Sequence, residues 1–227
     1  MQPYFLTCYC GRLMSLTRKV TLLSLIALSG CSATTSNTSE TIKYALLGSD
    51  DVTVTNAHVT NLPYASAYLK IGDNPRVFVV LAYVNGEDLS WLTADNVMIV
   101  TRHGRIIKTV GLENDLISLI NESADPLSTK PTSTAQWQAI AEWQQRYVSG
   151  YQMKGHITQR GQDTLDLVTR QINADRFEEK ISLTPSSTSW TNTFWRDSST
   201  GQVVKTQQQL GPNMPVIELT ILKPFSS

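Results

Sequence analysis

The sequence predicts a mainly β fold: antiparallel meander sheets, half-barrel or sandwich-like, with one packed amphipathic helix. Runs of strand length rich in valine, isoleucine, threonine and tryptophan recur along the chain, and clusters of turn-forming residues separate them. Apolar residues spaced three and four apart over residues 134–148 predict the helix. With 227 residues, 41% of them hydrophobic, the chain is long enough to bury a substantial core.

The first part of the body is predicted to form successive hairpins. Asn85-Gly86 is the strongest turn signal, because both central residues of a type I′ turn need positive φ. His103-Gly104 marks a second hairpin, and leucine spacing predicts a short helix within residues 112–120. Strands are expected over residues 51–59, 65–71, 76–84, 89–93, 97–101 and 106–110.

The second part is predicted to be a helix followed by a meander. The helix over residues 134–148 begins with a capping-box pattern, Ser133 to Gln136, and carries an aromatic stripe. We expect one domain over residues 45–227; the alternative is two β sub-domains, 45–125 and 150–227, bridged by helix 134–148. Strands are expected over residues 151–159, 164–172, 176–183, 189–197, 203–210 and 216–222.

The N-terminus has the pattern of a secretory signal peptide, residues 1–30. Arg18 and Lys19 precede an uncharged apolar run over residues 20–28, and small residues follow. This run is shorter than the roughly 20 residues that a membrane-spanning helix needs. Residues 1–13 are interpreted as an over-long start, because residues 14–31 alone make a complete signal.

Leu28-Ser29-Gly30-Cys31 resembles the lipobox of bacterial lipoproteins, in which the cysteine is lipidated after cleavage of the signal. The resemblance implies lipidation of Cys31, and residues 31–44 are predicted to form a flexible tether. Ser32 at the second mature position implies, by resemblance to the sorting rule of diderm bacteria, an outer-membrane anchor with the body facing the periplasm. The alternative is a plain signal peptide with an incidental cysteine.

Charge and composition exclude several classes of function. Lysine plus arginine number 19 and aspartate plus glutamate number 19, so no broad basic field is available for nucleic acid. Three cysteines and three histidines are too few for a disulfide framework or a zinc cage. His58, His103 and His156 lie in separate predicted segments, so we expect neither a metal site nor a bound cofactor.

No catalytic residues are predicted, and the protein is expected not to be an enzyme. Gly-x-Ser-x-Gly is absent from the sequence. Adjacent acidic pairs, Asp50-Asp51, Glu87-Asp88 and Glu178-Glu179, point to opposite faces when they lie on strands and would not converge on one bond. A glycan-cleaving enzyme would instead bring two carboxylates to about 5–9 Å from each other in a cleft.

Several stretches in order along the mature chain resemble the group 4 capsule polysaccharide lipoprotein family, the YjbF/GfcB type of outer-membrane lipoproteins. This resemblance implies a mainly β fold and a role in capsule or exopolysaccharide production, and it supplies no catalytic residues. The stretches that carry it are residues 62–66, 71–73, 78–82, 91–97, 104–112 and 190–197.

The remaining candidates for ligand binding are aromatic. Tyr151, Trp190 and Trp195 are predicted to line a groove that stacks on sugar rings; the alternative is that they belong to the core. We therefore expect a non-catalytic accessory in polysaccharide production or export that binds glycan or export-machinery proteins. The competing hypothesis is a lipid or acyl-chain carrier with an apolar cavity under the helix.

Overall fold

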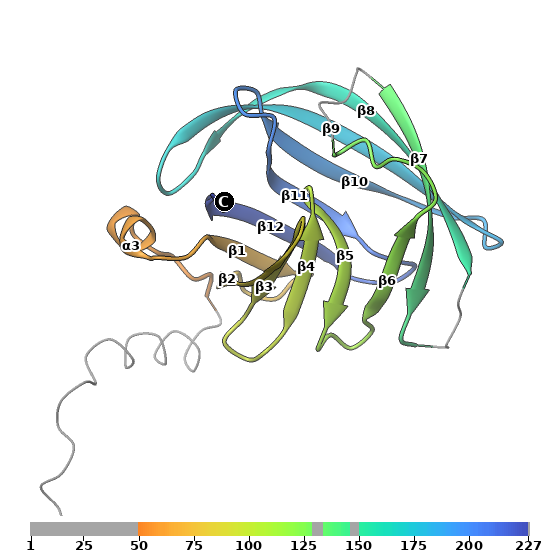
Figure 1. The fold of residues 1–227 in the computed structure, drawn as a ribbon, viewed down its shortest axis with the longest axis horizontal. Coiled ribbons are helices and arrows are strands. Elements are labelled where there is room, and N and C mark those ends of the chain that lie inside the picture. The colour runs from red at the N-terminus through yellow and green to blue at the C-terminus, as the bar shows by residue number, and fades with distance from the viewer. Residues whose placement is uncertain (1–49, 129–133, 146–149, 227) are drawn as a thin grey trace, which may run out of the picture. The chain divides into compact units, whose positions relative to one another are not determined.

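The computed structural model describes residues 50–128, 134–145 and 150–226, all within the compact unit Leu47–Ser227. The predicted signal peptide, the tether and Cys31 lie outside the described residues. Figure 1 shows a short helix α3 (Asn56–Asn61) followed by strands β1 (Ser66–Ile71), β2 (Val77–Asn85), β3 (Asp88–Leu92), β4 (Met98–Arg102), β5 (Arg105–Val110), β6 (Leu116–Asn121), β7 (Thr134–Trp143), β8 (Tyr151–Asp166), β9 (Gln171–Thr184), β10 (Thr188–Asp197), β11 (Val203–Gln209) and β12 (Val216–Lys223).

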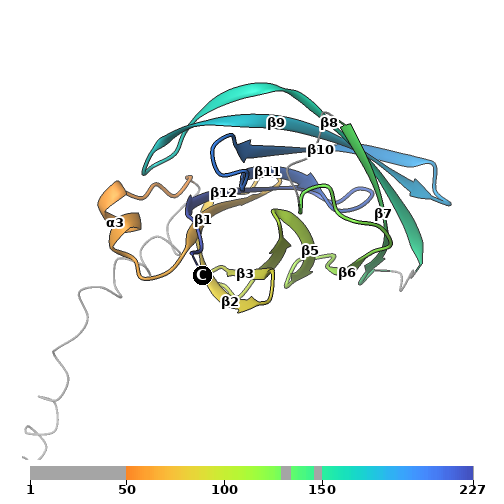
Figure 2. The ribbon, with the colours of Figure 1, turned by 45° about the horizontal axis from the view of Figure 1, so that its top comes forward.

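All the strands form one antiparallel sheet in the order β5-β4-β3-β2-β1-β12-β11-β10-β9-β8-β7-β6. The first and last strands therefore pair with each other in the middle of the sheet, and its two ends are β5 and β6, which are consecutive in the chain. Figure 2 shows the sheet curling until these two strands lie side by side. The prediction of a mainly β antiparallel fold is confirmed, but the sheet is a nearly closed barrel rather than a half-barrel or a sandwich.

Side chains close the seam between β5 and β6, where the described residues show no backbone ladder. The hydroxyl of Thr109 donates to Oδ1 of Asp115 at 2.9 Å and accepts from the backbone N–H of Leu116 at 2.9 Å. The Asp115 carboxylate also accepts from the N–H groups of Gly111 and Leu112. Buried sheet-edge polar groups are thus satisfied without strand pairing.

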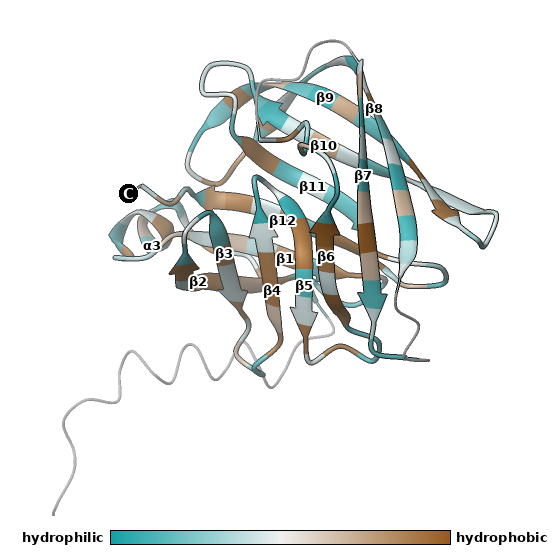
Figure 3. Ribbon diagram, turned by 45° about the vertical axis from the view of Figure 1, so that its right-hand side comes forward, coloured by the Kyte–Doolittle hydropathy of each residue, from teal (hydrophilic) through white to brown (hydrophobic). Residues whose placement is uncertain are grey.

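The core lies on the inner face of the curled sheet. Alternate residues of each strand point inward, as the period of a strand requires, and hydrophobic and hydrophilic bands alternate along the strands in Figure 3. Large side chains fill the interior, led by Trp91 and Trp137. Their main partners in the core are Leu69, Ile99, Ile106, Leu116, Ile181, Ile217 and Leu219.

The predicted helix over residues 134–148 is wrong in the described part of that segment, because residues 134–143 form strand β7. Trp137, Ala139, Ala141 and Trp143 are buried at every second position. The same residues also fit part of a helical stripe, since Ile140 and Ala141 lie three and four residues after Trp137. Pairing with β6 and β8 decides for the strand, and among residues 50–128, 134–145 and 150–226 no packed amphipathic helix occurs.

Three other local predictions are corrected. Within residues 51–59 the helix α3 begins at Asn56, capped by the hydroxyl of Thr55, and within 112–120 the strand β6 replaces the predicted short helix. The predicted turn at residues 160–163 is a bulge inside the long strand β8. The chain reverses later, where Leu167 and Arg170 exchange backbone hydrogen bonds.

Candidate functional site

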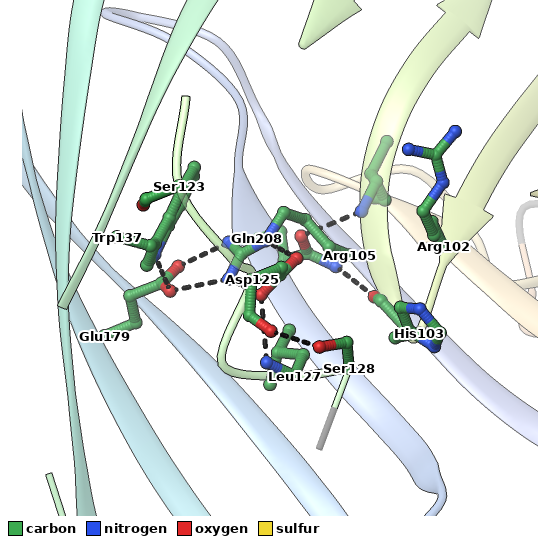
Figure 4. A network of polar contacts seen from close by, with 12 residues as sticks. Arg102, His103, Arg105, Ser123, Asp125, Leu127, Ser128, Trp137, Glu179 and Gln208 are labelled. Atoms are coloured by element: carbon green, nitrogen blue, oxygen red, sulfur yellow. Dashed lines mark hydrogen bonds and ion pairs between the residues drawn. The ribbon is translucent and has the colours of Figure 1, made fainter. Parts of the chain in front are cut away.

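A buried ion network lies inside the barrel and consists of Arg105, Asp125 and Glu179 (Figure 4). The Arg105 guanidinium donates from Nε to Asp125 Oδ2 at 2.7 Å and from Nη2 to Asp125 Oδ1 at 3.0 Å. It also donates from Nη1 and Nη2 to the two oxygens of Glu179, both at 2.8 Å. One planar guanidinium thus holds two carboxylates by paired bonds, the geometry in which such bonds are strongest.

Aromatic rings enclose the guanidinium. Its central carbon lies 3.9 Å from the ring centroid of Trp137 and 5.4 Å from that of Phe194. The indole N–H of Trp137 donates to Glu179 Oε1, so the same tryptophan contacts both the cation and one of its anions. Gly155 on β8 makes room for this ring, since an added Cβ would lie 2.0 Å from Trp137 Nε1.

Electrostatics hold the network in its charged form. Burial disfavours the charged guanidinium, but the carboxylates of Glu179 and Asp125 outweigh burial and raise the pKa of Arg105. Burial also acts to raise the pKa of Asp125, yet the charge and hydrogen bonds of Arg105 hold that pKa below its ordinary value. Two carboxylates thus face one guanidinium.

A pocket of about 760 Å³ opens at one end of the barrel. We call it the mouth pocket. The antiparallel order brings to this end the β2–β3 turn, the β4–β5 turn, the β10–β11 loop and the segment that follows β12. Rim residues include Glu87, His103, Ser199, Gln202 and Phe225, and inner residues include Trp91, Thr101, Thr206 and Leu219.

The mouth pocket and the buried ion network share a wall. The side-chain amide of Gln208 donates to the carbonyl of Gly104 at 2.9 Å and accepts from the N–H of Ile106 at 3.1 Å, which fixes the β4–β5 turn above Arg105 (Figure 4). Leu127, which lines the pocket, donates its N–H to Asp125 Oδ1 at 2.9 Å. Burial lowers the pKa of Arg196, another lining residue, and the charge of Asp125 partly offsets this.

Two lining hydroxyls have no hydrogen-bond partner among the described residues. They are Thr206 Oγ1, on a residue only 2% exposed, and Ser198 Oγ. Most buried polar atoms in proteins are paired, with protein or with ordered water. Both oxygens are themselves buried, so they lie just behind the pocket surface, and a molecule in the pocket reaches them only when the covering side chains move.

The structure separates the three aromatic residues predicted to bind a ligand. Trp190 is buried in the main core, and Tyr151 packs at the margin of that core against Trp143, with ring centroids 6.0 Å apart. Trp195 lies five residues beyond Trp190 on β10, hence on the opposite face. There it packs with Ala174 and Val204 and donates to Asp163 at 2.7 Å. These residues line no common groove.

The carboxylates and histidines singled out in the sequence each contact partners at separate places in the structure. Of the predicted divergent pair, Glu178 faces outward to Arg160 at 3.1 Å, and Glu179 is fully buried against Arg105. Glu179 and Asp125 do converge, but Arg105 occupies both of them, unlike a glycosidase pair facing a cleft. His103 lies 3.3 Å from Glu87 at the pocket rim. Among residues 50–128, 134–145 and 150–226, no group of side chains suited to a metal ion occurs.

Sequence reasoning missed the buried ion network, although one signal pointed to it. Glu179 stands at an inward position of an otherwise apolar alternation, with Phe177 before it and Ile181 and Leu183 after it. A carboxylate at such a position requires a buried partner. The partner itself is not readable locally, since Arg105 is 74 residues away in the chain.

Comparisons with known proteins identify the family. Residues 39–222 match the family model described as "Group 4 capsule polysaccharide lipoprotein gfcB, YjbF". The chain belongs to this lipoprotein family. It is 33% identical to the uncharacterized lipoprotein GfcB of Escherichia coli (strain K12), covering 89% of this chain and 97% of the relative, and 31% identical to the uncharacterized lipoprotein YjbF of the same strain, covering 91% and 97%.

A solved structure has a fold similar to that of this chain. The crystal structure of the hypothetical lipoprotein YmcC from Escherichia coli (K12) has a TM-score of 0.72 and 30% sequence identity, and the match covers 87% of this chain and all of that one. The predicted family resemblance is confirmed. In the described part of the chain, none of the helices is both long and apolar enough to cross a bilayer.

Proposed function

We propose that this lipoprotein is a non-catalytic accessory of capsule or exopolysaccharide production or export, and that its mouth pocket binds a glycan. Family membership supports the polysaccharide context. The observation that carries the binding site is the mouth pocket itself, about 760 Å³, in which polar residues lie among the rings of Trp91 and Phe225. Behind its surface, the hydroxyls of Thr206 and Ser198 lack a partner in the described chain.

The chemistry of the pocket suits a sugar. A hydroxyl both donates and accepts, so Thr206 and Ser198 match the hydroxyl groups that a sugar presents in either role. Apolar faces lie among these polar groups, with Trp91 inside and Phe225 at the rim, and aromatic rings can pack on the C–H faces of a sugar ring. The mixture of polar and apolar lining favours a hydroxylated ligand over a hydrocarbon chain.

An acyl-chain carrier receives less support. That hypothesis places an apolar cavity under a helix, and the segment expected to form the helix is strand β7. Tryptophans and a charged guanidinium held by two carboxylates occupy the described interior. A hydrocarbon chain that entered this interior would lie against charged and polar groups, so the interior is not the apolar cavity that such a ligand needs.

The anchor and its location complete the proposal. We infer that Cys31, followed by Ser32 and a polar tether, is lipidated and holds the body at the periplasmic face of the outer membrane. Intact-mass measurement of the mature protein tests this. The expected polypeptide begins at Cys31 and carries acyl chains, whereas Cys31→Ser carries none; a mature chain that begins elsewhere contradicts the anchor.

Binding is tested by calorimetric titration of the purified full-length protein with oligosaccharides prepared from the capsule of the producing strain. Thr206→Val keeps the side-chain shape and removes the unpaired hydroxyl. We expect it to weaken binding by roughly fivefold to tenfold, the value of one hydrogen bond. Thr53→Val, in the exposed segment before α3 and away from the mouth pocket, is the matched control and should bind like the wild type.

Equal affinities of the wild type and Thr206→Val would place the ligand elsewhere, and no binding by the wild type would remove the glycan from the proposal.

The accessory role is tested separately, by deleting the gene and measuring surface polysaccharide. Wild-type protein should restore the output and Cys31→Ser should not. Restoration by Thr206→Val, despite lost glycan binding, would point to export-machinery proteins as the relevant partners.

A further inference from the structure

A second polar surface lies on the outer face of β7 to β10, away from the mouth pocket. In register, Gln136 on β7, His156 on β8, Lys180 on β9 and Thr191 on β10 form one cross-strand row. The next row is Gln138, Lys154, Ser182 and Ser189, and all eight side chains are exposed. We call the two rows the basic patch.

The basic patch is hollowed rather than flat. A depression of about 540 Å³ is lined by members of both rows on three strands, together with Ser123, Trp137 and Gly155. None of its lining residues also lines the mouth pocket. Long side chains standing on neighbouring strands thus form walls around a shallow depression, with amide and hydroxyl groups between two lysines.

The positive charge of the basic patch is uncompensated. Within the described residues no carboxylate forms an ion pair with Lys154 or Lys180, and the nearest outward acid on β9, Glu178, is paired with Arg160. Lys154 and Lys180 are diagonal neighbours on adjacent strands, and His156 lies two residues from Lys154. The body as a whole is mildly acidic once residues 1–30 are removed, so this concentration of cations is a local feature.

We propose that the basic patch binds a polyanionic glycan, a polysaccharide chain bearing carboxylate or phosphate groups. Two ammonium groups on adjacent strands can each bind one anionic group along such a chain. Between them, Gln136, Gln138 and Ser182 offer hydrogen bonds to sugar hydroxyls.

A membrane surface fits the patch less well than a glycan. Peripheral membrane binding combines cations with apolar side chains that enter the acyl region. The two rows contain no apolar side chain, and the strongly exposed apolar residue nearest to them, Ile120, lies on β6 beyond the end of the rows. The surface therefore suits a hydrated, charged polymer.

The proposal is independent of the mouth pocket and is tested with its own probe. Purified full-length protein in uncharged detergent is titrated with polygalacturonate, a uronic acid polymer, and with neutral dextran. The wild type should bind polygalacturonate, progressively more weakly as salt is raised, and should not bind dextran. The double variant K154Q/K180Q should bind polygalacturonate about tenfold more weakly, because two charge-assisted contacts are lost.

Matched variants make the outcome decisive. K154R/K180R retains both charges and should bind within about threefold of the wild type, since charge dominates the contact. K70Q/K108Q removes the same charge from β1 and β5 and should leave binding unchanged. Thr206→Val should also leave it unchanged, which separates this surface from the mouth pocket.

Three results would overturn the proposal: no polygalacturonate binding at low salt, equal weakening in K154Q/K180Q and K70Q/K108Q, or weakening by Thr206→Val alone. Binding to lipid vesicles is the last test. If K154Q/K180Q loses a preference for phosphatidylglycerol over phosphatidylcholine vesicles while it keeps its affinity for polygalacturonate, the patch serves lipid headgroups and the glycan assignment is wrong.

Discussion

The buried ion network and the mouth pocket are neighbours, but they differ in whether their polar groups have hydrogen-bond partners. Every charged oxygen of Asp125 and Glu179 has a donor, supplied by Arg105, Trp137 or Leu127. Two hydroxyls of the pocket have no donor or acceptor in the described chain. Complete satisfaction indicates a structural role in closing the barrel, whereas the two buried hydroxyls beside the pocket keep unused hydrogen-bonding capacity.

Removing the cation should have the largest effect. Arg105→Met leaves two buried carboxylates without their cation and should lower the free energy of unfolding by about 3–5 kcal/mol. The control is Arg102→Met, which breaks the half-exposed pair with Asp88 and should cost roughly 0–1 kcal/mol. Urea denaturation measures both, and similar losses for the two arginines would contradict the structural role of the network.

The seam offers the next test. Thr109→Val removes the hydroxyl that bonds Asp115 and the N–H of Leu116; the Leu116 N–H is left unpaired and the Asp115 carboxylate loses one of its donors. We expect a loss of about 1–3 kcal/mol in the free energy of unfolding. Faster hydrogen exchange at Leu116 should accompany the loss, because its amide would no longer have an acceptor. Unchanged exchange there would show that the hydroxyl does not hold the seam.

Acid should weaken the network through Asp125. Because its folded pKa lies below the unfolded value, its contribution is complete above the ordinary pKa of about 4 and is lost as the pH falls through the folded pKa. One such group changes the unfolding free energy by at most about 1.4 kcal/mol per pH unit. Urea midpoints between pH 7 and pH 3 should fall less steeply in Asp125→Asn than in the wild type; parallel curves would contradict this.

The smallest effect on stability is expected in the mouth pocket. Thr206→Val replaces an unpaired buried hydroxyl by a methyl group of the same shape and should leave the free energy of unfolding within about 0.5 kcal/mol of the wild type or raise it. The contrast with Thr109→Val uses the same substitution in both regions. A large loss at Thr206 would mean that its hydroxyl has a structural partner, and the comparison drawn above would fail.

Local sequence signals predicted the hairpins of the first half well. His103 and Gly104 are the central residues of the β4–β5 turn, and both have positive φ. The β2–β3 hairpin also forms where it was predicted, but Asn85 pairs with Asp88, so the central residues are Gly86 and Glu87, of which Gly86 alone has positive φ. Local signals failed where two periods coincide, as in β7, whose alternating tryptophans and alanines also fit a helical spacing. They failed again at the β8–β9 turn, which contains neither glycine nor proline.

The site could not be predicted in the same way. Family resemblance gave the polysaccharide context, but the mouth pocket assembles loops from distant parts of the chain, and its unpaired hydroxyls are ordinary serine and threonine residues in the sequence. Trp190, one of the residues predicted to bind sugar, packs in the main core, because a strand that curls around a core must fill it with large side chains.

The pairing of β1 with β12 has a consequence for how the chain can be cut and rejoined. The described strands begin with β1 and end with β12, which are neighbours, while the only break in the ladder of these strands falls at the turn over residues 111–115. A circular permutant of residues 50–226 opened at that turn, with a linker from the end of β12 to residue 50, would keep every strand pair intact. Loss of the last strand, by contrast, would split the sheet through its centre.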